Sequence, residues 1–285
     1  MNRVLDVLTQ PLTYAFMTRG MLAAIMVGVV CAVVGSYMVL RGMAFFSDAL
    51  SHTILPGVAL GYLFNGGTSG ALFWWGLVTA VAASLGIGAL SKSAEIKEDT
   101  AIGIVFAGMF ALGVALISTV RSYTVDLTHL LFGNVLGVSN QDLWLTAIFG
   151  GLIIITVLAL YKELLVVSFD PTLATTLRLP VGFLYYLLLV LIATAIVVSL
   201  QTVGITLVLA LLVTPAATAF LLTRRLPAMM TLAALIGAFS GVVGLYLSFY
   251  FSIASGAAIV LVCTAIFLLV FLFAPQRGWA WRRSN

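Results

Sequence analysis

A carboxylate and an imidazole lie four residues apart inside an apolar stretch of the chain. Asp48 and His52 occur in RGMAFFSDALSHTILPGVALGYLF, which otherwise has the composition of a membrane-spanning segment. A spacing of four places both side chains on one face of a helix, about one turn apart. An imidazole nitrogen and a carboxylate oxygen suit zinc, manganese or ferrous iron. The pair therefore predicts half of a site for a passing divalent cation, which a second copy of the chain would complete to four ligands.

The position of Asp48 within an apolar segment needs a compensating role, because an ionisable group in a bilayer costs about 2.5 to 3.5 kcal/mol on insertion scales. Two roles fit the residues. Asp48 and His52 line a route for a metal ion, or they hydrogen-bond each other or a neighbouring helix and join packed spans. We take the first as the working hypothesis, and the second remains open.

A further carboxylate and imidazole, Asp126 and His129, lie in the connector RSYTVDLTHLLFGNVLGVSNQD (121–142). Its apolar part is too short to span a bilayer and too apolar for an ordinary loop. Non-helical backbone at membrane depth must be buried in protein or line a cavity, so the connector predicts a short re-entrant or interfacial helix. An interfacial polar residue is the simpler interpretation of His129, and a gate or accessory metal ligand is the alternative.

The composition leaves one class of protein to hold these residues. Of the 285 residues 63% are hydrophobic and 8% charged, whereas soluble domains are roughly a quarter charged. A bilayer core needs about 20 apolar residues per helix. The sequence thus predicts an all-α polytopic membrane protein with eight to nine transmembrane helices. Nine apolar runs of this size occur, at 20–40, 45–64, 71–90, 100–118, 143–161, 181–200, 205–222, 229–250 and 257–273. They form one transmembrane domain (20–273), after an amphipathic lead-in (1–19) and before a tail (274–285).

Basic residues predict the orientation of the spans. Nine spans with the N-terminus outside and the C-terminus in the cytoplasm place ten basic residues inside and three outside, as the positive-inside rule requires. The ten are Arg41, Lys92, Lys97, Lys162, Arg178, Arg224, Arg225, Arg277, Arg282 and Arg283, and the three are Arg3, Arg19 and Arg121.

The connector KELLVVSFDPTLATTLRLPVGF (162–183) is cytoplasmic in this orientation. Asp170 and Pro171 are a good N-cap and first-turn residue for a helix, and Pro180 ends it. We therefore expect a short stiff helix at about 170–179. Nothing in the chain is available to cover its outer face, so we expect a partner to cover it.

Other residues predict architecture or exclude functions. Pro56 with Gly57, and Pro215, are expected to kink their helices. The chain has no GxxxxGK[ST] motif and no HExxH motif, which excludes ATP hydrolysis by a P-loop and a zinc-protease centre of that type. The basic residues lie in short connectors and form no basic domain, so no nucleic-acid partner is expected.

Five segments, in this order, resemble the membrane subunit of a metal-ion ABC importer of the zinc, manganese and iron type. They are MVLRGMAFFSDALSHTILPGVALGY, DLTHLLFGNVLGV, SFDPTLATTLRLPV, SLQTVGITLVLALLVTPAATAFLL and GLYLSFYFSIASGAAIVLV. In that family the D-A-x-S-H pattern supplies the metal ligands, which implies this role for Asp48 and His52. The family's FDPxxAxxLG helix docks on a separate ATPase. The matching positions are Phe169, Asp170, Pro171, Ala174, Leu177 and Arg178, where arginine replaces the usual glycine.

The resemblance also implies the activity and the partners. The chain is expected to be a transport subunit and no enzyme, moving manganese, zinc or iron into the cell across the bacterial cytoplasmic membrane. A second permease copy, an ATP-binding subunit and an external metal-binding protein are the implied partners. The competing hypothesis is an ion-coupled secondary transporter, in which Asp48 carries a proton or cation and no ATPase docks. A membrane-embedded enzyme fits poorly, because no second ionisable cluster faces Asp48 within the spans.

Overall fold

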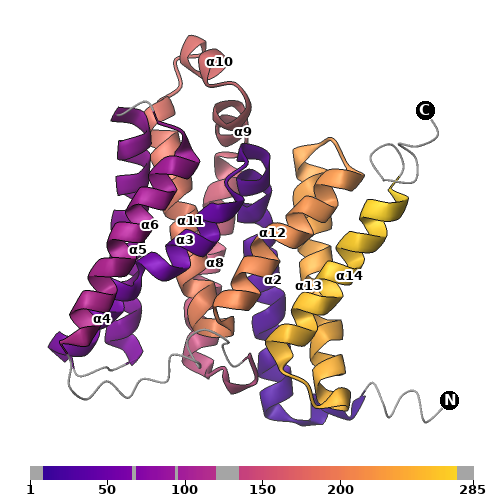
Figure 1. Ribbon diagram of the computed structural model, residues 1–285. Coiled ribbons are helices and arrows are strands. Elements are labelled where there is room, and N and C mark those ends of the chain that lie inside the picture. The colour runs from indigo at the N-terminus through magenta and orange to yellow at the C-terminus, as the bar shows by residue number, and fades with distance from the viewer. Residues whose placement is uncertain (1–8, 66–68, 94–95, 120–134, 275–285) are drawn as a thin grey trace. The chain divides into compact units, whose positions relative to one another are not determined.

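The computed structural model describes residues 9–65, 69–93, 96–119 and 135–274, and the regular structure in these ranges is helical (Figure 1). The prediction of an all-α protein is confirmed. The predicted lead-in is described only from Thr9, the tail only at Ala274 and the predicted re-entrant segment only from Val135. Residues 15–19 of the lead-in belong to the first long helix.

Eight helices in the described part of the chain are long and apolar enough to cross a membrane. Their backbone groups are paired within the helix, which is what a segment surrounded by lipid requires. Each corresponds to one of the predicted apolar runs. The eight are α2 (Ala15–Arg41), α5 (Ser69–Ser93), α6 (Glu98–Ser118), α8 (Asn140–Ala159), α11 (Val181–Val203), α12 (Ile205–Leu222), α13 (Leu226–Phe251) and α14 (Ser255–Phe273).

The remaining apolar run, 45–64, forms two short helices, α3 (Ala44–Thr53) and α4 (Leu55–Asn65). Neither reaches the length of a span, so the count of long helices is eight, the lower of the two numbers predicted. The interruption falls at Ile54, and Pro56 is the second residue of α4. Proline has no backbone N–H to donate to the carbonyl four residues earlier, which explains why the helix does not continue from α3.

The chain forms two compact units, each assembled from separate stretches of sequence. The first takes in α2 up to Val39, α8 up to Ile154, the end of α11 from Val198, and α12 to α14. The second takes in Leu40 onward through α6, the end of α8 from Ile155, and α11 up to Val197, together with α9 (Tyr161–Phe169) and α10 (Pro171–Thr176).

Within the first unit α12, α13 and α14 contact one another, and α2 packs closely on α12 and α13 through glycine. The Cα of Gly28 faces the backbone of Gly237, and a Cβ on either residue would lie about 3.0 Å from the other helix. Gly35 lies against the backbone of Leu212 in the same way. Small residues at these positions allow the helix backbones to approach, as is usual between membrane helices.

Two features of the first unit concern α12 itself. A single residue, Gly204, joins α11 to α12, with φ of 87° and ψ of 163°, a conformation open essentially to glycine alone. α12 then continues through Pro215, which is buried inside the helix.

The second unit is built around α3 to α6, among which α4 contacts α5 and α6, and α3 contacts α6. Gly57 lies against Trp75 and Thr79 of α5, so that glycine permits close packing of α4 on α5. A Cβ on Gly113 of α6 would lie 2.8 Å from the side chain of Leu55. This packing holds α3, the helix of the Asp48–His52 pair, in a fixed place beside α6.

Candidate metal-binding site

Asp48 and His52 lie on the same face of α3, as their spacing predicts. The Oδ1 atom of Asp48 is 3.8 Å from the Nε2 atom of His52. This separation is too long for a hydrogen bond, so the two groups are adjacent but do not satisfy each other. The Asp48 side chain is 46% exposed and that of His52 29% exposed. Both side chains are therefore partly exposed, and the pair is not closed off in a dry contact.

The imidazole of His52 is held by two aromatic rings of α6. Its centroid lies 6.0 Å from the ring centroids of both Phe106 and Phe110, edge-on to Phe110. Edge-to-face contacts at this distance are favourable and fix ring orientation. α6 thereby fixes the side of α3 on which the His52 ring lies.

The two serines beside the pair are buried and belong to the packing. Ser51 donates through its hydroxyl to the Ser47 carbonyl at 2.8 Å, as serine often does within a membrane helix. The Ser47 side chain is fully buried. Of the polar residues in this stretch, Asp48 and His52 are thus the two that present ligand atoms at the open face.

One copy of the chain provides an incomplete metal site. Among the described residues no three His, Cys, Asp or Glu side chains come close enough together to hold a metal ion. Protein-bound transition metals generally take three or four protein ligands. Asp126 and His129, predicted as gate or accessory residues, lie outside the described residues. The pair on α3 therefore offers at most two candidate ligands within one copy of the chain.

The predicted cytoplasmic helix begins where the sequence places it. Asp170 is the N-cap of α10 and accepts a hydrogen bond from the Leu173 N–H at 2.9 Å, and Pro171 is the first helical residue. The helix ends at Thr176, which is earlier than the predicted end near residue 179. The end is set before Pro180 by a cap that involves Arg178.

Arg178 adopts the left-handed conformation, with φ of 56°. Its N–H donates to the Thr175 carbonyl at 2.9 Å, and the next N–H, of Leu179, donates to the Ala174 carbonyl at 3.0 Å. These two bonds form a Schellman cap, whose left-handed residue is usually glycine. The arginine thus takes the conformation that glycine would take, at a local cost in strain.

The short helix presents apolar side chains outward. Phe169, Leu173 and Leu177 follow one another at four-residue spacing and are 47 to 60% exposed. Ala174, by contrast, is fully buried, and α10 contacts α9. Every residue of α10 except Ala174 is exposed, and the exposed apolar side chains in and beside it are Leu173, Phe169 at the end of α9 and Leu177 at the C-cap.

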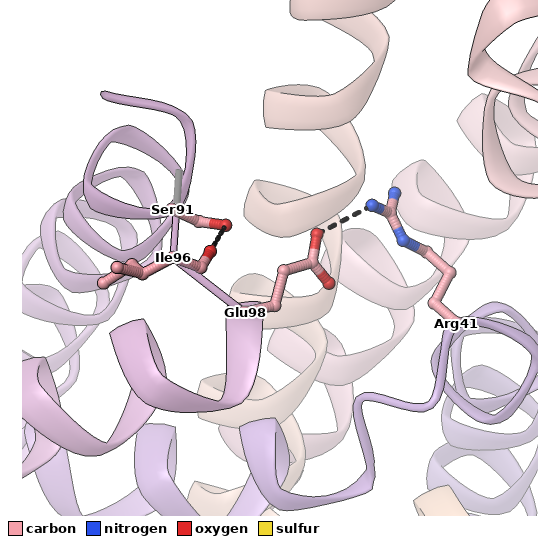
Figure 2. Close-up of polar contacts among 4 residues, drawn as sticks. All are labelled: Arg41, Ser91, Ile96 and Glu98. Carbon is pink, nitrogen blue, oxygen red and sulfur yellow. Dashed lines mark hydrogen bonds and ion pairs between the residues drawn. The ribbon is translucent and has the colours of Figure 1, made fainter. Parts of the chain in front are cut away.

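An ion pair that the sequence did not predict lies near the start of α3. Arg41, at the end of α2, is bonded through Nη2 to Oε1 of Glu98 at 3.0 Å (Figure 2). Its guanidinium also lies 4.8 Å from the ring centroid of Tyr185 on α11. Arg41 and Glu98 are 57 residues apart. No local pattern connects such residues, although both stand at predicted helix ends.

Eight long apolar helices among the described residues define a polytopic membrane protein. The profile of the ABC 3 transport family matches residues 13–274. The chain belongs to that family.

Known proteins similar to the chain cover nearly its whole length. The manganese transport system membrane protein MntC of Listeria monocytogenes is 50% identical over 93% of this chain and 93% of its own length. MntC of Halalkalibacterium halodurans is 45% identical over 97% of this chain and 95% of its own. The solved structure of PsaBC from Streptococcus pneumoniae in complex with Fab superposes with a TM-score of 0.83 at 37% identity, covering 99% of this chain and 100% of that chain.

Family membership defines the kind of activity. The chain is the permease of an ABC transporter and acts in transport. The competing hypothesis of a secondary transporter is not favoured.

Proposed function

We propose that the chain is the permease subunit of an ATP-driven importer that carries a divalent transition-metal ion, manganese, iron or zinc, across the bacterial cytoplasmic membrane. The observation that carries the proposal is the Asp48–His52 pair, whose ligand atoms are open and unbonded to each other on a helix within the membrane domain. The relatives named for manganese transport support the choice of ion class.

The geometry of the pair suits brief capture of an ion. Two ligands about 2.1 Å from one metal ion stand roughly 3.0 to 3.5 Å apart, depending on the coordination number. The observed 3.8 Å needs only a small rotation of either side chain to reach that range. One nitrogen and one oxygen ligand bind weakly enough for release, which transport requires. The same donor set accepts manganese, iron and zinc, so it does not select one metal.

A second copy of the chain would complete the site. Two half-sites facing each other across a two-fold axis supply two carboxylates and two imidazoles, which makes a four-ligand ring. The exposed fractions of Asp48 and His52 in a single copy leave room for such a partner. We propose a homodimer with the α3 helices at its centre.

Coupling to ATP is proposed to occur through α10. The apolar residues Phe169, Leu173 and Leu177 would insert into a cleft of a separate ATP-binding subunit. Apolar side chains this exposed in a cytoplasmic connector are typical of a surface that binds another protein. Asp170 and Pro171 set the start of the helix, and Arg178 its end. Ala174 contributes by packing α10 on its own chain and does not face the ATPase.

The topology and the external partner complete the proposal. We place the N-terminus outside and the C-terminus in the cytoplasm, following the distribution of basic residues, which requires that α3 and α4 together cross the membrane as one broken span besides the eight long helices. ATP binds the partner subunit. A metal-binding protein outside the membrane delivers the ion to the permease.

Uptake by the reconstituted complex tests the proposal. Vesicles holding the permease with its ATPase in the lumen should accumulate manganese when ATP is enclosed with the ATPase and the metal-binding protein is supplied outside. Asp48→Asn and His52→Ala should reduce uptake to the level of protein-free vesicles while leaving the amount of folded complex unchanged. Asp99→Asn is a matched control that removes an exposed carboxylate from the first turn of α6 and should transport normally. Normal uptake by Asp48→Asn or His52→Ala refutes the ligand assignment.

A further inference from the structure

The corner between α2 and α3 consists of Gly42 and Met43, and of the two only Met43 packs a side chain into the protein. Gly42 has a φ of 72°, and a Cβ built on it would meet no atom within 4 Å. Glycine is thus required here for its conformation and not for close packing. The direction in which α3 leaves α2 therefore depends on the packing of Met43 and on the contacts on either side of the corner.

Arg41 supplies the contact before the bend. Its side chain is 13% exposed and that of Glu98 27% exposed, so the pair is partly shielded from water and less screened than a surface ion pair. The Tyr185 ring covers the guanidinium at 4.8 Å. A cation on an aromatic face gains further stabilisation when it is desolvated. Arg41 is therefore fixed both to α6 and to α11.

Glu98 is fixed in turn at the start of α6. It is the first residue of that helix, where a carboxylate is favoured by the helix dipole. The Ser91 hydroxyl donates to the Ile96 carbonyl at 3.2 Å, two residues before Glu98, and so ties α5 to the approach of α6 (Figure 2). The carboxylate that receives Arg41 thus stands on a well-supported backbone.

The same helix also holds the far end of α3. Phe106 and Phe110 of α6 contact the His52 ring, about two and three turns after Glu98. α6 therefore contacts the end of α2 through the Arg41–Glu98 ion pair, and it contacts His52 through the two phenylalanine rings. A movement of the corner away from Glu98 would tilt α3 and carry Asp48 and His52 away from α6.

We infer that Arg41 and Glu98 are positioning residues, which hold the Asp48–His52 pair in the geometry that captures the ion. This inference rests on the proposed function of that pair. Arg41 and Glu98 touch no ion themselves, and their effect passes through the direction of α3.

A comparison of Glu98→Gln with Asp99→Asn tests the inference in the reconstituted complex. Both changes remove a carboxylate from the first turn of α6, so both lose the same dipole interaction, and only Glu98 binds Arg41. We expect Glu98→Gln to raise the manganese concentration for half-maximal uptake by about tenfold, with a smaller change in the maximal rate. Asp99→Asn should leave both within about twofold, and Arg41→Lys, which keeps the charge, should fall between. If Glu98→Gln leaves the half-maximal manganese concentration unchanged, the inference is overturned. The same holds if its maximal rate falls only in proportion to the amount of folded complex.

A double mutant separates lost pairing from an unrelated defect. Glu98→Gln leaves the Arg41 charge shielded and unpaired, whereas Arg41→Met with Glu98→Gln removes both charges. If the two residues act as a pair, the double mutant should bind manganese no more weakly than Glu98→Gln. Effects that multiply would show that the residues act independently and would contradict the inference.

A distance measurement keeps this inference separate from the proposed function. Spin labels at Phe45→Cys on α3 and Ile104→Cys on α6 would lie at exposed positions, and the native Cys31 and Cys263 are fully buried. Glu98→Gln should shift or broaden the distance between the labels, and Asp99→Asn should not. If the unmutated complex transports no metal but the distance still changes, the proposed function fails and the positioning role stands. An unchanged distance overturns the positioning role whatever the uptake shows.

Discussion

Replacement of Arg178 by glycine should stabilise the end of α10. A non-glycine residue in the left-handed region costs about 1 to 2 kcal/mol. Glycine removes that strain, but it also gives the opened chain more conformational freedom, which offsets about 0.4 to 1 kcal/mol of the gain in stability. The net gain is about 1 kcal/mol against local opening, which corresponds to roughly a fivefold smaller open population.

Hydrogen exchange of the complex in detergent measures this gain directly. The amides of Arg178 and Leu179 donate the two bonds of the cap, and that of Leu177 donates to the Leu173 carbonyl at 3.0 Å. We expect the amides of residues 177 and 179 to exchange about fivefold more slowly in Arg178→Gly.

Arg178→Ala is the control, because alanine loses the charge but keeps the strain. Its exchange at these amides should match that of the unmutated chain. If Arg178→Gly and Arg178→Ala behave alike, the left-handed strain is not what limits this helix, and the reasoning fails. ATPase binding by Arg178→Ala then reports the role of the charge alone, and the difference between the two variants reports the role of the cap.

Three further changes have defined outcomes. Gly35→Ala should lower the melting temperature of the detergent-solubilised permease by several degrees, because the new Cβ would meet the Leu212 backbone, at an overpacking cost of about 1 to 3 kcal/mol. Gly86→Ala is the control at an open helix position and should be neutral or stabilising. Equal shifts in the two variants would contradict this account. Gly204→Ala should destabilise the chain by about 1 to 3 kcal/mol in the same melting assay, since its φ of 87° suits glycine, and an unchanged melting temperature would show that the turn relaxes without cost. Leu173→Asp should abolish copurification of the ATPase without loss of folded permease. Thr175→Asp, also exposed on α10, should have a weaker effect. Retention of the ATPase by Leu173→Asp would exclude the exposed apolar side chain of α10 from the docking surface.

The long helices and the common face of Asp48 and His52 were predictable from the sequence, because both depend on local patterns. Apolar runs of about 20 residues mark spans directly, and the four-residue spacing of Asp48 and His52 fixes their common face on any helix. The N-cap at Asp170 is local as well, since its bond reaches only to Leu173. These features need no knowledge of the tertiary fold.

What the sequence did not reveal depends on backbone detail or on contacts distant in the chain. The hydropathy of residues 45–64 predicts one span. The missing N–H of Pro56 interrupts the helix there, so that this segment forms α3 and α4. The early end of α10 depends on a left-handed arginine, which no propensity favours. The Arg41–Glu98 pair joins helix ends 57 residues apart, so only the fold brings them together.

The most direct test of the account is whether His52 binds the transported ion. Pulsed electron paramagnetic resonance on the complex loaded with Mn²⁺ detects a coordinated imidazole by the coupling of its nitrogen to the metal. We predict that this nitrogen coupling is present in the unmutated complex and disappears in His52→Ala. A coupling that persists undiminished in His52→Ala, or that is absent from the loaded unmutated complex, would contradict the central claim.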